Sequence, residues 1–205
     1  MDSNQPTCNN CESPLVSSLF CFYCNTIQPY SSSTNFFKVF GFQVSFEVNP
    51  EELEERYQKL SFGLHPDFFV SASSEEKLLS EGATAILNNA YTTMKDQTSR
   101  ADYLLKLLFE KQNLDDRSLP DGFLAEMFFL QEELDNLIDS KDLINLSNMY
   151  KNIQKRKNNI EAEYFVLFRK YEENPEDSKI PQQLQTNLNA ERYLKRILER
   201  IPTSG

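Results

Sequence analysis

Four cysteines near the start of the chain are the clearest sign of chemistry in the sequence. They form two Cys-x-x-Cys pairs separated by nine residues: Cys8, Cys11, Cys21 and Cys24. Two residues between thiolates let one turn of backbone offer both sulfurs to a single ion, and two such pairs complete a tetrahedron. The spacing therefore predicts one structural zinc ion, because four cysteine ligands leave no open position for catalysis.

Three other uses of these cysteines are considered. Two disulfides would suit a secreted domain, but the first residues, Met-Asp-Ser-Asn-Gln-Pro, show no secretory signal. A redox-active pair at Cys21 and Cys24 is expected beside a thioredoxin-like βαβ unit, which the surrounding sequence does not suggest. Iron in place of zinc is the third alternative. In this short segment with few aliphatic residues, a metal would supply the folding free energy that a core cannot.

The single histidine, His65, is followed by Pro66 and Asp67. Catalysis of the Ser-His-Asp or Cys-His type would depend on this one side chain. Taken alone, a histidine is more often a surface or capping residue than a functional one. In this tripeptide, however, proline restricts the backbone, and the side chains of His65 and Asp67 bring a hydrogen-bond donor and a carboxylate close together.

Composition excludes several classes of function. The 205 residues include 31 acidic and 21 basic side chains, a formal net charge of −10. Such a balance argues against nucleic-acid binding, which needs a cationic surface. Five glycines and no Gly-rich phosphate-binding pattern argue against nucleotide loops. No apolar run reaches the ~18 residues of a membrane span, so no membrane partner is expected.

Two amphipathic helices are predicted on either side of the His65-Pro66-Asp67 loop. The first begins with Asn49 as N-cap and Pro50, and ends before Pro66; the second begins at a capping box in Ser73–Glu76. Because their apolar residues recur at matching spacings, the helices are expected to pair as an antiparallel hairpin with the loop at its tip. These residues are Leu53, Tyr57, Leu60 and Leu64, then Ala83, Leu87, Ala90 and Met94.

The remaining sequence predicts further helices and sets the domain boundaries. A short apolar turn at 36–40 precedes the hairpin, and a leucine-rich helix from Thr98 to about Phe109 follows it. Three later helical patterns, the second about 45 Å long at 1.5 Å per residue, suggest an antiparallel three-helix bundle. The predicted fold is all-α, with a cysteine module and linker at 1–34, a helical-hairpin domain at 35–110, a hinge at 111–120 and the bundle at 121–205.

The loop and its surroundings resemble the J-domain of the DnaJ family. His-Pro-Asp stands after Tyr57-Gln58-Lys59-Leu60 and before Leu87-Asn88-Asn89-Ala90-Tyr91, as between the second and third helices of that domain. The resemblance implies that the protein is no enzyme itself but docks on a DnaK-type heat-shock chaperone and stimulates its ATPase. The docking residues it implies are His65, Pro66, Asp67, Arg56 and Lys59.

Two features depart from the J-domain pattern. The helix before the loop is usually strongly basic, whereas here four glutamates (Glu51, Glu52, Glu54 and Glu55) offset Arg56 and Lys59, so weaker electrostatic steering is expected. In addition, Phe62 and Gly63 occupy its last turn, and Phe68-Phe69 replaces the commoner lysine after the tripeptide.

A second resemblance narrows the family. Ser99–Leu105, Phe123–Met127 and Glu132-Glu133-Leu134 are similar to HscB-type co-chaperones of iron–sulfur cluster assembly, and a preceding module with two Cys-x-x-Cys pairs is similar to animal-type members. The resemblance implies that the bundle binds an IscU-type scaffold protein and delivers it to the chaperone. It also implies a mitochondrial location, although no transit peptide is evident; the cytoplasm is the alternative.

The same resemblance points to a scaffold-binding site at Leu124, Phe128 and Tyr193. Leu124 and Phe128 lie roughly 120° from the apolar stripe of their helix, and Tyr193 lies roughly 100° from its own. A wide core, or packing against the hairpin domain, is the competing interpretation. The cationic run Lys151, Lys155, Arg156 and Lys157 is interpreted as a solvated helix face, with a minor contact to an acidic partner as the alternative.

Two other functions remain open. One is a general J-protein that holds unfolded clients on its bundle and has no part in cluster assembly. The other is a redox or metal-transfer protein that works through the cysteines.

Overall fold

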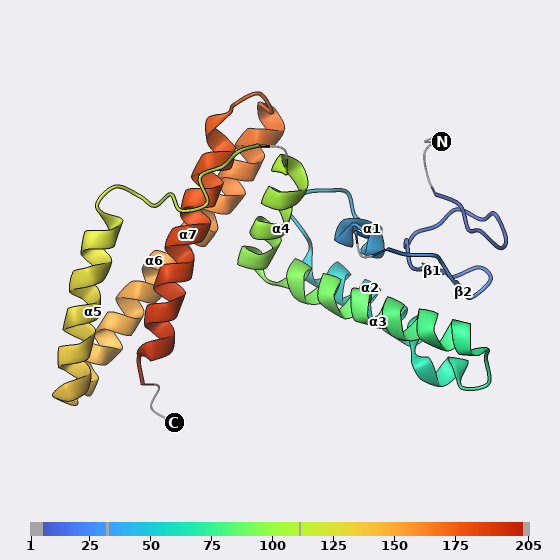
Figure 1. Ribbon diagram of the computed structural model, residues 1–205, viewed down its shortest axis with the longest axis horizontal. Coiled ribbons are helices and arrows are strands. Elements are labelled where there is room, and N and C mark those ends of the chain that lie inside the picture. The colour runs from blue at the N-terminus through green and yellow to red at the C-terminus, as the bar shows by residue number, and fades with distance from the viewer. Residues whose placement is uncertain (1–5, 32, 111, 203–205) are drawn as a thin grey trace. The chain divides into compact units, whose positions relative to one another are not determined.

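The computed structural model describes residues 6–31, 33–110 and 112–202 (Figure 1). The prediction that the first residues carry no secretory signal or transit peptide concerns mainly residues 1–5, which lie outside the described residues. Ser32 of the predicted linker, Lys111 of the predicted hinge and residues 203–205 also lie outside them. The chain divides into two compact units, Met1–Arg100 and Ala101–Gly205. The division falls inside a helix, ten residues before the predicted end of the hairpin domain, and the predicted domain boundaries stay a prediction.

The fold is mostly helical, with one two-stranded antiparallel sheet of β1 (Phe20–Cys21) and β2 (Thr26–Ile27), which confirms the predicted all-α class. Across the described residues, the helices lack any apolar stretch of membrane-spanning length.

The first unit is built around a helical hairpin. After the short helix α1 (Phe36–Phe40), helices α2 (Pro50–Leu64) and α3 (Ser74–Lys95) pack against each other, with a 3-10 turn η1 (Pro66–Phe69) between them. Asn49 accepts hydrogen bonds from the first turn of α2, and Ser73 and Glu76 form the expected capping box of α3. The apolar residues predicted for the hairpin core are buried, apart from Tyr57, which stacks on Tyr91 with ring centroids 4.0 Å apart.

The second unit is a three-helix bundle, as predicted. Helices α5 (Phe123–Asp139), α6 (Leu143–Glu173) and α7 (Lys179–Arg200) pack around one apolar core (Figure 1). The 31 residues of α6 match the length expected from the sequence. Helix α4 (Gln97–Phe109) begins at the end of the first unit, and its last residue, Phe109, meets Tyr171 with ring centroids 4.8 Å apart.

The predicted hinge is hydrogen-bonded along α7. Gln182 bonds both the backbone N–H and the carbonyl oxygen of Asp115, and the hydroxyls of Ser118 and Thr186 lie 2.6 Å apart. The Asn189 amide donates to two further carbonyl oxygens of this segment. The segment predicted as a hinge is therefore hydrogen-bonded to α7. Its described part is not the free hinge that its polar composition suggested.

Candidate functional site

The four cysteines come together in space. Their sulfur atoms all lie within 4.8 Å of one another, with Cys8 and Cys24 at 3.6 Å and Cys11 and Cys21 at 3.7 Å. Sulfurs bound at about 2.3 Å to a tetrahedral ion are separated by about 3.8 Å, whereas a disulfide holds them at about 2.0 Å. All four are free thiols. The donor set therefore fits a four-coordinate metal ion and does not fit the two-disulfide alternative.

Local backbone geometry builds this cluster from two similar turns. The residue directly after each second cysteine, Glu12 and Asn25, has a positive φ angle, which lets the chain fold back beside the sulfur pair. The short sheet places Cys21 opposite Thr26. The backbone N–H of Asn10 and the side-chain amide of Gln28 both donate to the Cys8 sulfur at 3.4 Å. Such donors stabilise thiolate charge and orient the ligand.

The cysteines differ in acidity. Side-chain hydrogen bonds with Thr26 and then Asn10 lower the pKa of the Cys24 thiol to about 6. Burial raises the pKa of the Cys21 thiol to about 11. Thiols bind metals as thiolates, so metal binding must release a proton from Cys21 at neutral pH.

The cysteine module packs on the helical hairpin. A Cβ atom added at Gly63 of α2 would lie 2.9 Å from the Phe20 ring, and one at Gly82 of α3 would lie 2.0 Å from the Tyr30 hydroxyl. That hydroxyl donates to the carbonyl oxygen of Leu79 at 3.1 Å. The absence of side chains at these two glycines thus allows the module to approach both helices closely. Tyr30, at the start of the predicted linker, is therefore bound to α3.

The His65-Pro66-Asp67 loop lies at the tip of the hairpin, as predicted. The Leu64 carbonyl oxygen at the end of α2 accepts hydrogen bonds from Ser80 (2.7 Å) and Thr84 (3.1 Å) of α3, which fixes the start of the loop. His65 caps η1, because its Nδ1 accepts from the backbone N–H of Asp67 at 3.3 Å. In the neutral ring this leaves Nε2 as the N–H donor. The side chains of His65 and Asp67 are exposed to solvent.

The two cations expected beside the loop differ in their surroundings. Lys59 is exposed and pairs with Glu55 at 2.6 Å. The Arg56 guanidinium instead donates to the carbonyl oxygen of Phe40, pairs with Glu52 and lies 4.4 Å from the centroid of the Phe42 ring. Arg56 therefore joins α2 to the end of α1 and is less available to a partner than the sequence suggested.

The predicted scaffold-binding residues fall into two environments in the second unit. Leu124 and Phe128 are exposed on α5, while Phe123 and Met127 point into the bundle core. Tyr193 is half-buried against that core, with its ring centroid 6.0 Å from that of Phe123. The structure thus supports the apolar surface at Leu124 and Phe128, whereas Tyr193 is mainly a packing residue at the edge of the core.

Sequence reasoning missed a third member of this surface, Phe129. Its side chain is exposed, and its ring lies edge-on to Phe128 with centroids 5.9 Å apart. The signal was present, because at 100° per residue Phe129 lies roughly opposite the stripe of Met127 and Leu134. We call Leu124, Phe128 and Phe129 the α5 surface.

The cationic run on α6 is not one solvated face. Lys151 and Lys155 are exposed as expected. Arg156, however, forms a two-pronged ion pair with Glu126 and lies over the Phe123 ring at 5.1 Å. Lys157 pairs with Glu161 and, at 3.3 Å, with the buried Glu191. The prediction was wrong for Lys157, whose side chain is largely buried, because its partner Glu191 on α7 is distant in sequence.

The buried Glu191 carboxylate, which pairs with Lys157, is also bound by a buried tyrosine. The Tyr164 hydroxyl donates to Glu191 Oε2 at 2.7 Å, and both side chains are buried in the bundle. Burial, with the nearby charge of Glu191, raises the pKa of Tyr164. Because Tyr164 and Lys157 both bind the buried carboxylate, removal of either partner would leave that charge less well paired, which is costly in a buried site.

The His-Pro-Asp loop between two paired helices is the arrangement on which the resemblance to J-domain proteins rests, and along the chain a four-cysteine module precedes this hairpin and a helical bundle follows it. No family model matches the sequence. The chain is 35% identical over 137 residues to the human protein named iron-sulfur cluster co-chaperone protein HscB. It is 36% identical over 109 residues to a co-chaperone protein HscB homolog of Vibrio cholerae. These matches span 64% and 53% of this chain, and 58% and 64% of the respective relatives.

The comparison with solved structures leads to the same proteins as the sequence comparison. The crystal structure of human co-chaperone protein HscB matches with a TM-score of 0.74 and 25% identity, covering 96% of both chains. Chaperone HscB from Vibrio cholerae has the same fold, with a TM-score of 0.68 and 23% identity over 82% of this chain and 95% of the other. In sequence and in fold, the chain resembles the HscB-type co-chaperones, which confirms the resemblance inferred from its motifs. The curated sequence matches cover less than two thirds of those relatives' length.

Proposed function

We propose that this protein is a co-chaperone of iron–sulfur cluster assembly. Its bundle binds an IscU-type scaffold protein, and its His65-Pro66-Asp67 loop stimulates the ATPase of the DnaK-type chaperone to which the scaffold is delivered. The observation that carries the proposal is the exposed loop held at the tip of the α2–α3 hairpin. His65→Gln is expected to abolish ATPase stimulation, because it removes the imidazole while leaving the buried hairpin contacts in place.

In this proposal the cysteine module binds one structural zinc ion through Cys8, Cys11, Cys21 and Cys24. The sulfur separations support a tetrahedral ion, and the all-thiolate donor set suits zinc. When bound, the ion holds the module in shape and takes no part in chemistry. By family resemblance the protein works in mitochondria, with the cytoplasm as the alternative.

The scaffold site is proposed on the α5 surface together with Tyr193. Exposed apolar side chains grouped on one helix are typical of a partner site, and aromatic residues often dominate its binding energy. Because Tyr193 packs on Phe123, it would act by holding that part of α5 as well as by direct contact.

Scaffold binding can be tested with the full chain in a pull-down. The triple change Leu124→Ala, Phe128→Ala and Tyr193→Ala is expected to remove binding, whereas Ile144→Ala, which truncates an exposed aliphatic side chain on α6, is the matched control. Binding that survives the triple change would place the site elsewhere. A wild-type chain that stimulates the chaperone but binds unfolded clients and no scaffold would favour the general J-protein.

A further inference from the structure

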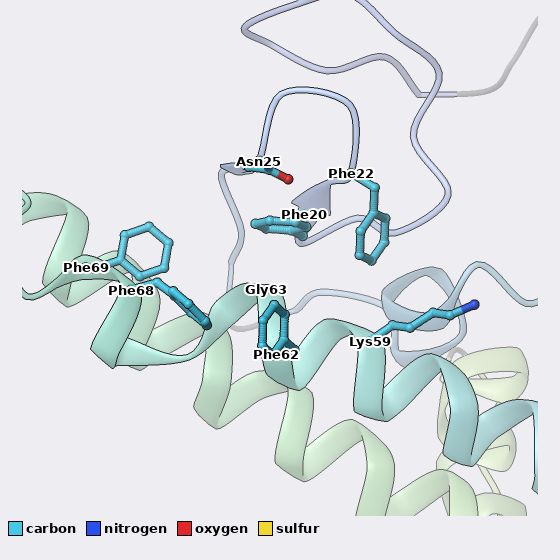
Figure 2. Close-up of a pocket in the computed structure, with 8 residues that line it drawn as sticks. All are labelled: Phe20, Phe22, Asn25, Lys59, Phe62, Gly63, Phe68 and Phe69. Carbon is cyan, nitrogen blue, oxygen red and sulfur yellow. The ribbon is translucent and has the colours of Figure 1, made fainter.

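The cysteine module and the hairpin together form a hollow of about 420 Å³ beside the His-Pro-Asp loop. Figure 2 shows its walls, with Phe20 and Phe22 reaching from the module toward α2, which contributes Phe62 and Gly63, while Phe68 comes from η1. Asn25, Lys59 and Phe69 complete the lining. Of the two departures from the usual J-domain pattern, the second, Phe62-Gly63 and Phe68-Phe69, therefore lies wholly in the lining of one hollow.

The hollow is aromatic and open to solvent. Phe62 is 71% exposed, Phe68 60% and Phe22 46%. The rings pair edge-on, Phe62 with Phe68 at 4.8 Å and Phe20 with Phe22 at 5.2 Å between centroids. Lys59 is the one charged lining residue, and its ammonium group pairs with Glu55. Exposed aromatic side chains gathered in this way mark an interaction site for apolar groups.

The position of the hollow indicates what covers it. Phe68 belongs to the same 3-10 turn as Pro66 and Asp67, and its ring centroid lies 6.5 Å from that of His65. A protein surface that contacts His65 and Asp67 therefore also reaches Phe68 and Phe62. The occupant that this continuity favours is the partner of the loop itself.

A second hollow continues this surface along α2. It has a volume of about 410 Å³ and shares Phe22 and Lys59 with the first. The module contributes Val16 and Phe22 to its lining, and α2 contributes mainly charged residues: Glu52, Glu55, Arg56 and Lys59. The module therefore adds apolar side chains to the surface beside α2, next to the charged residues of that helix.

We propose that the cysteine module is part of the chaperone-docking surface. The aromatic hollow that it forms with α2 and η1 receives apolar side chains of the DnaK-type chaperone engaged by the His-Pro-Asp loop. This inference rests on the proposed function. Glutamates offset the cations of α2, so electrostatic steering toward the chaperone is weak. Apolar contacts in the hollow compensate for part of this loss.

The test is a titration of the ATPase of a DnaK-type chaperone with the full, metal-loaded chain. Phe62→Ala and Phe22→Ala are expected to raise the half-maximal concentration about fivefold to thirtyfold, the effect of truncating an anchoring aromatic residue. The matched controls are Tyr23→Ala and Leu78→Ala, which truncate exposed apolar side chains that do not line the hollow. Their half-maximal concentrations should stay within about twofold of wild type. Metal content of one ion per chain verifies that each variant keeps its module.

The outcomes separate this inference from the proposed function. If the wild-type chain gives no stimulation, the proposed function fails and the inference fails with it. If wild type stimulates and His65→Gln does not, but Phe62→Ala and Phe22→Ala titrate like the controls, the inference alone is wrong. If sedimentation shows a wild-type dimer that Phe62→Ala dissociates, the hollow is an interface between two copies, and the inference is again overturned.

Discussion

Replacing Gly63 with alanine tests whether the cysteine module rests on α2. In a helix this change ordinarily stabilises by about 0.5–1 kcal/mol, because glycine loses more backbone entropy on folding. Here the added Cβ would lie 2.9, 3.0 and 3.2 Å from three atoms of the Phe20 ring. Carbon atoms pack best at about 3.5–4.0 Å, so the ring has to move, and overpacking of this kind costs about 1–3 kcal/mol. The net expectation is a destabilisation of about 1 kcal/mol.

The sign of this effect should depend on Phe20. In a Phe20→Leu background the ring is gone, so Gly63→Ala should regain the ordinary helix stabilisation of about 0.5–1 kcal/mol. The two changes would then be coupled by about 2 kcal/mol in a double-mutant cycle. Hydrogen exchange of the α2 amides in the full chain reports the opening free energy of this unit. An equal stabilisation by Gly63→Ala in both backgrounds would refute the packing of the module on α2.

Two further predictions concern the bundle and the metal. Tyr164→Phe removes the hydroxyl that donates to the buried Glu191 carboxylate at 2.7 Å, and it should destabilise the bundle by about 1–3 kcal/mol. Denaturant unfolding measures this loss. Tyr150→Phe is the control, because the Tyr150 ring is more exposed. Since the pKa of Tyr164 is raised in the fold, wild-type stability should fall as the pH rises above ~10, where the unfolded chain ionises, and Tyr164→Phe should lose that component. A wild-type pH profile identical to that of the variant would contradict this reasoning. Chelation, or the substitution Cys11→Ser, should remove one zinc ion per chain and speed hydrogen exchange of the β1 and β2 amides. The α6 amides should keep their protection. Unchanged hydrogen exchange in β1 would mean that the module folds without metal.

Local signals in the sequence were sufficient to predict the helices of both units. Asn49 with Pro50, and Ser73 with Glu76, act through hydrogen bonds within a single turn, so the helix starts can be predicted without knowledge of the rest of the fold. The spacing of the cysteines likewise predicted each Cys-x-x-Cys turn, and the shared need of the two pairs for one metal ion predicted that they meet. Predictions of this kind depend on residues close together in sequence.

Contacts between distant segments could not be predicted in the same way. Nothing near Gly63 indicates that Phe20 lies against it, and nothing near Arg156 or Lys157 indicates Glu126 or Glu191 as partners. The hydrogen bonds of Asp115 and Ser118 to α7 also join segments that are distant in sequence. For this reason the polar segment that was predicted as a hinge is bound to α7. The aromatic hollow beside the loop is likewise the product of a long-range contact, which is why Phe62 and Phe68 looked only like departures from a pattern.

In the proposed function, this chain couples an IscU-type scaffold to a DnaK-type chaperone through the His65-Pro66-Asp67 loop. The most direct measurement is the steady-state ATPase rate of the chaperone with the full chain, in the presence and absence of scaffold, for wild type and for His65→Gln. We expect stimulation by wild type that increases further when scaffold is added. We expect none by His65→Gln, although this variant should still retain scaffold in a pull-down. Equal stimulation by the two proteins, or a wild-type rate that scaffold leaves unchanged, would contradict the proposed function.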